Sequence, residues 1–270
     1  MAQEMEVGIY TWFGFRYSFI DIVKLIKNAG FQSVMTWWGD EYRETNGPKE
    51  CQPEIIRNSG LRHENTHFTF AGINKIWEDS IDGQEIFNMY FSYIGDCKIY
   101  EIPTAVMHVS SGENPPPYGQ LGLDRFKRLI EKAEKDDINI ALENLRKPEY
   151  LDYIFKNIES DKLKFCYDCG HENCFTPDID FLAKYGDKLI ALHLHDNDGT
   201  SDQHLLPFNG NVNWNRIMTH LETLDYKGAL ALEIDAQHID VSNEFTAQEY
   251  LSEAINRAYK LMDMKKIFRE

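Results

Sequence analysis

Short apolar runs alternate with longer amphipathic segments along this sequence, and the alternation constrains the fold more than any other feature. The predicted strands are residues 7–13, 32–37, 62–68, 105–109, 139–143, 164–168, 190–195 and 229–234. The predicted helices between and after them are residues 18–29, 85–100, 123–135, 148–158, 179–185, 214–224 and 246–262. Helical crossovers build parallel sheets, so eight such units without a linker predict an α/β fold, a single (β/α)8 TIM barrel over residues 1–270.

The pattern inside the strands agrees with a closed barrel. Successive side chains of a strand point alternately into the lumen and out to the helices. In the last predicted strand, one face carries small residues and then Glu233, while the other face carries Leu and Ile. The same order ends at Glu143 in the fifth strand and at His193 and His195 in the seventh. We therefore expect ionisable residues at the C-terminal ends of the inward faces.

Composition and charge narrow the class of protein. The sequence is 43% hydrophobic and 27% charged, which suits a globular protein and excludes disorder, collagen and coiled coil. Forty-four acidic against 28 basic residues give a net charge of −16, which argues against a nucleic-acid partner without excluding one. No run reaches the roughly 18 apolar residues of a membrane span, and no leader is evident. We expect a cytoplasmic protein whose five cysteines are reduced.

Ionisable residues gather at the C-terminal ends of the predicted strands, where barrel enzymes place their active sites. They are His67, His108, Glu143, Asp168, His171, His193, His195 and Glu233, with Asp202 and His204 in the loop before the last strand. Burying so many ionisable groups without a counter-charge is costly, and a divalent metal ion provides that charge. Imidazole and carboxylate ligands suit Zn²⁺, Mn²⁺, Co²⁺ or Mg²⁺. We expect one ion, or up to three, with Glu143, Asp168, His193 and Glu233 as central ligands.

Five short motifs carry a resemblance to a known family. They are Ala-Leu-Glu-Asn at 141–144, Asp-Cys-Gly-His at 168–171, His-Leu-His-Asp at 193–196, Asp-Gln-His at 202–204 and Leu-Glu at 232–233. Their order and positions resemble those of the xylose isomerase-like barrels, which include sugar isomerases and epimerases, inositol-catabolism enzymes and endonuclease IV. The resemblance covers essentially the whole chain. It implies a metal-dependent isomerase or epimerase that acts on a sugar, sugar phosphate or polyol derivative.

The ketose 3-epimerases of this superfamily give the most direct comparison. They hold one Mn²⁺ or similar ion, and the resemblance assigns its four ligands to Glu143, Asp168, His193 and Glu233. It also implies an enediolate intermediate, with Glu143 and Glu233 as base and acid on its opposite faces. One departure concerns an arginine that these epimerases carry after the seventh strand. Here residues 198–200 read Asp-Gly-Thr.

Endonuclease IV, which cleaves DNA at abasic sites with three zinc ions, is the main alternative. Its five histidines and four carboxylates could correspond to His67, His108, Glu143, Asp168, His171, His193, Asp202, His204 and Glu233. The residues after Asn144 and the Pro-Phe-Asn-Gly segment at 207–210 depart from the nuclease pattern, and the negative charge gives no long-range attraction for DNA. An inosose dehydratase-like lyase and a catalytically inactive sugar-binding barrel are further alternatives.

Residues outside the metal ligands could contact a small carbohydrate. Trp12 and His195 are the expected substrate-lining residues, because rings near strand ends can stack on sugars. Four basic residues could bind a substrate phosphate, although no glycine-rich phosphate loop accompanies them: Arg16, Arg43, Lys75 and Arg146. Residues 110–119 contain three consecutive prolines and predict a stiff lid or spacer over the barrel mouth. The sequence leaves substrate identity and oligomeric state open, although barrels of this type often pair.

Overall fold

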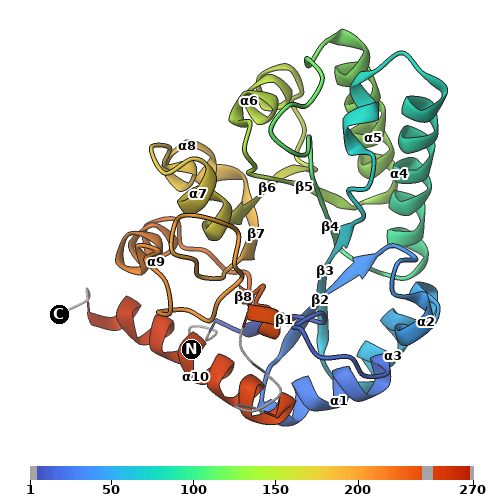
Figure 1. The fold of residues 1–270 in the computed structure, drawn as a ribbon. Coiled ribbons are helices and arrows are strands. Elements are labelled where there is room, and N and C mark those ends of the chain that lie inside the picture. Colours follow the sequence, from blue (N-terminus) through green and yellow to red (C-terminus); the bar gives the residue numbers. More distant parts are fainter. Residues whose placement is uncertain (1–4, 239–245, 268–270) are drawn as a thin grey trace.

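Eight parallel strands form a nearly closed barrel in the computed structural model, which describes residues 5–238 and 246–267 (Figure 1). The strands are β1 (Val7–Tyr10), β2 (Ser33–Trp38), β3 (Arg62–Phe68), β4 (Thr104–Met107), β5 (Asn139–Glu143), β6 (Leu163–Asp168), β7 (Leu189–His193) and β8 (Leu230–Leu232). Strands β1 to β7 pair in chain order, and β1 also pairs with β8. Leu194 joins β7 to β8, because it donates to Ala231 O and accepts from Glu233 N, each at 3.0 Å. The predicted (β/α)8 fold is confirmed.

The helices lie around the outside of this barrel (Figure 1). They are α1 (Phe19–Ala29), α2 (Arg43–Asn46), α3 (Gln52–Ser59), α4 (Ile81–Ile99), α5 (Gln120–Asp136), α6 (Pro148–Asn157), α7 (Cys169–Phe175), α8 (Phe181–Tyr185), α9 (Trp214–Thr223) and α10 (Ala247–Ile267). Helices α2, α3 and α7 were not predicted, because each is short and has too few apolar residues to show a helical repeat. Within the described ranges, no helix is both long and apolar enough to span a bilayer.

Helix α1 illustrates how the local sequence sets these boundaries. Ser18 Oγ accepts a hydrogen bond from Asp21 N and so caps the first turn. Gly30 ends the helix in the left-handed conformation, at φ 99°. Between these ends, Ile22 and Ile26 belong to the buried face that packs in the main core. Burying a side chain of this size contributes about 1.5–3 kcal/mol.

Small apolar side chains fill one part of the barrel lumen. Ala141 packs with Val106, Cys166 and Ala191 in a cluster separate from the main core. Its neighbour Leu142 belongs to the main core instead. The predicted inward face of the fifth strand is thereby confirmed. Because that face continues to the C-terminal end of the strand, the ionisable residue there points to the mouth of the barrel.

Candidate metal centre

Four ionisable residues meet where the last four strands end. Glu143, Asp168 and His193 are the final residues of β5, β6 and β7, and Glu233 directly follows β8. Ligand atoms from all four lie within 4.8 Å of one another. His193 Nδ1 is 3.2 Å from Glu143 Oε1 and 3.1 Å from Glu233 Oε2. The structure thus brings the four expected central ligands together, with an imidazole between two carboxylates.

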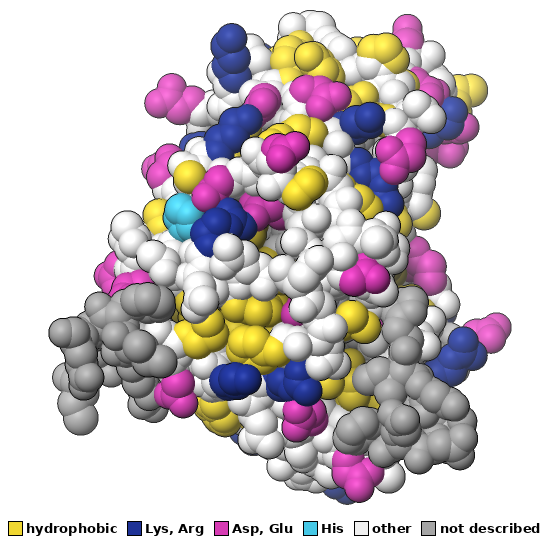
Figure 2. Space-filling view, turned by 60° about the vertical axis from the view of Figure 1, so that its left-hand side comes forward, with side chains coloured by type: hydrophobic (Ala, Val, Ile, Leu, Met, Phe, Trp, Pro, Cys, Tyr) yellow, Lys and Arg dark blue, Asp and Glu magenta, His cyan; other side chains and the backbone are white. Residues whose placement is uncertain are grey.

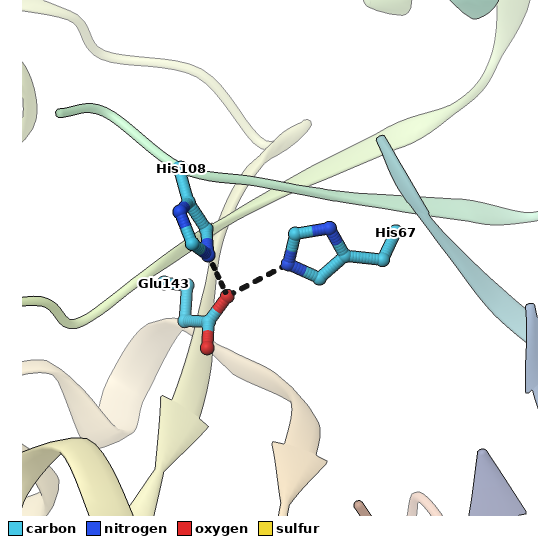
Figure 3. Close-up of side chains that lie close together, drawn as sticks. All are labelled: His67, His108 and Glu143. Carbon is cyan, nitrogen blue, oxygen red and sulfur yellow. Dashed lines mark hydrogen bonds and ion pairs between the residues drawn. The ribbon is translucent and has the colours of Figure 1, made fainter. Parts of the chain in front are cut away.

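A second group of ligands shares Glu143 with the first. His67 lies in β3 and His108 directly follows β4, and both rings point at one oxygen of Glu143 (Figure 3). The Nε2 atoms of His67 and His108 lie 3.0 and 3.1 Å from Glu143 Oε2, whereas His193 faces Oε1. The ligand atoms of this group also lie within 4.8 Å of one another. The two oxygens of Glu143 therefore face two sets of imidazoles, as suits a carboxylate between two ions.

A third group surrounds Asp202. His171 lies in α7, while Asp202 and His204 lie in the loop between β7 and α9. Asp202 Oδ2 is 3.2 Å from His171 Nε2 and 3.3 Å from His204 Nε2. His171 Nδ1 is also 3.2 Å from Glu143 Oε1, which connects this group to the first. All nine residues considered for up to three ions therefore gather in one continuous network.

In the part of the chain that the structure describes, the ion-pair partners of the carboxylates in this network are all histidines. Among the described residues, no Lys or Arg forms an ion pair with Glu143, Asp168, Asp202 or Glu233. Burial raises the pKa of Glu143, but the charge of His193 and the other histidines outweighs burial and holds this pKa well below its usual range. The same balance lowers the pKa of Glu233 to about 2. Ionised carboxylates in such a place need a cation, and this donor set fits a divalent metal ion.

The histidines around Asp202 respond to the same charges. Burial lowers the pKa of His204, but its hydrogen bond to Asp202 and nearby carboxylates raise the pKa to about 10. The pKa of His171 is likewise raised well above its usual value, because Asp168 and Asp202 outweigh burial. Burial dominates at His108 and lowers its pKa. Metal binding near Asp202 would displace protons from His171 and His204, so it weakens as the pH falls.

Backbone and side-chain hydrogen bonds fix the position of Asp168. Its Oδ1 accepts from His171 N at 2.6 Å, where Asp168 caps the N-terminus of α7. The side chain of Asn144 donates to Asp168 O and accepts from Asp168 N, both at 2.8 Å. The residue after the expected ligand Glu143 therefore holds the next ligand along the barrel.

The structure places His195 behind the ligands, away from the cavity wall where we expected it. This residue is fully buried, and its Nε2 lies 3.1 Å from Asp168 Oδ1. Its ring stacks on His204, with ring centroids 4.0 Å apart. The ring fits there because Gly170 has no side chain, since a Cβ at that position would overlap the imidazole. His195 does not line the cavity, but its ligand atom lies within 4.8 Å of those of His204 and Glu233, so this group could also hold a metal ion.

Sequence reasoning gave no role to Asp196, which holds the loop that carries the third group. Its Oδ1 accepts from Asn197 N at 2.9 Å and from Val212 N at 3.1 Å. Its Oδ2 accepts from Phe208 N at 2.8 Å and from Trp214 Nε1 at 3.0 Å. The start and the end of the loop thus share one buried carboxylate. The only signal in the sequence was an acidic residue directly after the motif His-Leu-His.

A cavity of about 290 Å³ opens above the network. Five Trp, Tyr and Phe residues line its wall: Tyr10, Trp12, Trp37, Tyr42 and Phe70. Trp12 was expected there, whereas Tyr42 and Phe70 lie in loops after β2 and β3, where periodicity gives no signal. Among the described residues, Arg146 is the one Lys or Arg in this wall, and the other three candidates for phosphate binding lie outside it. The volume suits a small molecule.

Comparison with known proteins gives the family. The model of the xylose isomerase-like TIM barrel matches residues 23–260. The uncharacterized protein y4fM of Sinorhizobium fredii is 27% identical to this chain in an alignment of 280 positions, gaps included, that covers 86% of this chain and 88% of that protein.

Two solved structures share the fold. A D-tagatose 3-epimerase-like protein matches with a TM-score of 0.75 and 20% identity, over 98% of this chain and 100% of that chain. An L-ribulose 3-epimerase matches with a TM-score of 0.78 and 13% identity, over 98% of this chain and 97% of that chain. Since the family model spans most of the sequence, this chain belongs to the xylose isomerase-like TIM barrel family.

Proposed function

We propose that this protein is a divalent-metal-dependent enzyme that isomerises or epimerises a sugar, sugar phosphate or related polyol derivative. The observation that carries the proposal is the placement of Glu143 and Glu233 on two sides of His193, next to a cavity with an aromatic wall. The shared fold with a D-tagatose 3-epimerase-like protein and an L-ribulose 3-epimerase supports it.

Glu143, Asp168, His193 and Glu233 would hold the catalytic ion. When bound, the ion polarises a substrate carbonyl and so acidifies the neighbouring C–H. The chain supplies the rest of the site. Asn144 and His195 keep Asp168 in place, and Gly170 leaves the space that His195 needs.

Glu143 and Glu233 are the groups that move the proton. Their lowered pKa values keep both carboxylates ionised near neutral pH, so either can take a proton from carbon. Return of this proton by the same carboxylate to the adjacent carbon, with transfer of the hydroxyl proton from one substrate oxygen to the other, completes an isomerisation. In an epimerisation, the other carboxylate first takes a proton from solvent water and then delivers it to the opposite face of the same carbon, while the first carboxylate returns its proton to solvent. His171 lines the cavity with a raised pKa, so it can donate a hydrogen bond to a substrate oxygen.

Deuterium uptake from heavy water tests this proposal directly. The metal-loaded protein is incubated with a panel of ketoses, aldoses and inososes, and uptake at carbon is followed by mass spectrometry. We expect the variants Glu143→Gln and Glu233→Gln to lower the rate by about 10²–10⁴-fold. The matched control is Glu64→Gln, which removes a buried carboxylate at the other end of the barrel and should keep the rate.

Other outcomes would change the assignment. A wild-type rate in Glu143→Gln or Glu233→Gln would refute the role of that carboxylate. Loss of water from an inosose would indicate a lyase that uses the same residues. Absence of uptake with every metal ion and every sugar would contradict the proposed reaction and favour a sugar-binding barrel.

Hydrolysis of a phosphodiester at abasic DNA is the second candidate. It is favoured by the groups around His67 and His108 and around Asp202, which give the network more ligands than one ion uses. Arg146 is the single Lys or Arg of the described cavity wall. On the face drawn in Figure 2, basic and acidic side chains are interspersed without a continuous basic patch. Neither surface offers the basic footprint of a DNA-binding protein.

Metal content separates the two candidates. Elemental mass spectrometry is applied to protein purified without a metal-affinity column, and the same sample is assayed on a duplex with one abasic site. One ion per chain and no incision would support sugar chemistry. Three zinc ions per chain with incision would make the nuclease the function of this site.

A further inference from the structure

Arg146 gives the cavity one chemically distinct side. It lies in the loop between β5 and α6, close along the chain to Glu143. Trp12, Trp37 and Phe70 come from the first three strands and the loops that follow them. A ligand of this cavity therefore meets an aromatic wall, the carboxylate–histidine network and one guanidinium.

The guanidinium of Arg146 is oriented but only partly used. Its central carbon lies 3.3 Å from the ring centroid of Phe175, in α7, so the planar group stacks on an aromatic face. Arg146 Nε donates to Glu113 Oε1 at 2.7 Å. Among the described residues, no acceptor takes a hydrogen bond from either Nη atom. Two N–H edges of a fixed planar fork are thus left for a ligand, which is the geometry that binds carboxylate or phosphate.

Glu113 is a partner that an incoming anion can replace. Its side chain is 73% exposed, and Gly112 before it has a φ of 74°, with open space where a side chain would stand. An exposed ion pair of this kind contributes little to stability. Glu113 therefore neutralises Arg146, and its replacement by another anion costs little free energy.

We propose that Arg146 binds an anionic group, a carboxylate or a phosphate, of the substrate. The uncharged part of the molecule then lies between the aromatic wall and the network of Glu143 and His193. This inference rests on the proposed function, because it takes the ligand of the cavity to be a carbohydrate. It selects, among carbohydrates, the sugar acids and sugar phosphates.

Paired probes that differ in charge test the proposal. D-gluconate is compared with D-sorbitol, and D-fructose 6-phosphate with D-fructose, on metal-loaded protein by calorimetry or by the fluorescence of Trp12 and Trp37. We expect one anionic probe to bind about tenfold or more tightly than its neutral partner. The pair that shows the difference identifies the anion as carboxylate or phosphate.

Variants assign the difference to the guanidinium. Arg146→Gln should weaken the anionic probe by about tenfold and leave its neutral partner unchanged. Arg146→Lys should restore part of the affinity, because the charge returns without the planar fork. Glu113→Gln should tighten the anionic probe by about two- to threefold, because a competing carboxylate is removed.

Several outcomes would overturn the proposal. These are equal binding of both members of each pair, equal weakening of both by Arg146→Gln, and failure of both anionic probes to bind at millimolar concentrations. The result is separable from the proposed function. Deuterium uptake by an anionic sugar in Arg146→Gln with the wild-type rate and KM would keep the function and remove the anion site. Arg146-dependent anion binding without uptake by any sugar would keep the site and remove the function.

Discussion

Buried carboxylates lie at both ends of the barrel lumen, but different groups neutralise them. At the N-terminal end, Glu64 Oε1 accepts from Ala229 N at 3.1 Å, and Oε2 accepts from Ser33 Oγ at 3.2 Å and from Arg62 at 3.4 Å. These partners lie in β2, in β3 and directly before β8, so the side chain of Glu64 crosses the lumen. A Cβ at Gly8 would lie 2.6 Å from Ser33 Oγ, which explains the glycine there.

At the C-terminal end, the partners of Glu143 are histidines, a residue type that can itself bind a metal ion. His67, His108, His171 and His193 all lie within 3.2 Å of its two oxygens. Burial raises the pKa of Glu64, whereas the histidines hold the pKa of Glu143 well below its usual range. One end is therefore built from fixed hydrogen bonds that hold the strands together. The other presents ionised groups that an added cation stabilises.

Of the changes considered, removal of metal is expected to have the largest effect on activity and on the free energy of unfolding. Chelation followed by dialysis should abolish deuterium uptake, and Mn²⁺ or Co²⁺ should restore it. Metal at about 1,000 times its Kd should raise the free energy of unfolding by about 4 kcal/mol, because the ion binds the folded chain. Thermal unfolding with and without metal measures the change. An equal melting temperature and unchanged activity after exhaustive chelation would contradict a metal centre at this end.

Asp196 lies at the C-terminal end of the barrel, but like Glu64 it is held by hydrogen-bond donors of the protein. Asp196→Asn replaces one oxygen by an amide that faces two N–H donors. We expect a loss of about 3 kcal/mol in the free energy of unfolding, measured by urea titration, since buried donors lose their acceptor. If Asp202 and His204 hold a second or third ion, the metal content should fall as well. A stability loss near zero would show that Asp196 does not hold the loop.

Glu64→Gln should have a smaller effect than Asp196→Asn. The glutamine can still accept from Ala229 N and donate to Ser33 Oγ, and Arg62 keeps its ion pair with Glu6. We expect a loss of about 1 kcal/mol in urea titration, with metal content and deuterium uptake unchanged. Reduced metal content in this variant would show that the two ends of the lumen are coupled.

The fold could be predicted from the sequence further than the site could. The strands are visible because their inward faces are small and their outward faces are Leu and Ile, as Ala141 and Leu142 show. The C-terminal ends of the inward faces also predicted most of the residues that lie together in the carboxylate–histidine network. The position of His195 could not be predicted, because it depends on space beside Gly170. The sharing of Glu143 between two groups depends on side-chain direction, which periodicity does not encode.

The smallest expected effect is a pH dependence of stability at His63, beside Glu64. Burial is the main cause that lowers the pKa of His63 to about 3, while the unfolded chain keeps a value near 6.5. The unfolded state therefore binds the proton first, so this contribution is complete above pH 6.5 and is lost as the pH falls toward 3. Between pH 7 and pH 6 the loss is about 0.7 kcal/mol.

The variant His63→Gln isolates this term from the histidines at the mouth. Glutamine can keep a hydrogen bond to Thr36 Oγ1, which lies 2.9 Å from His63 Nε2, and it does not titrate. The difference in unfolding free energy between wild type and variant should therefore change by about 0.7 kcal/mol from pH 7 to pH 6, with wild type losing more. His171 and His204 have raised pKa values, so their contribution has the opposite sign and is lost as the pH rises. Since both proteins share that contribution, a pH-independent difference would mean that His63 is not held neutral by burial.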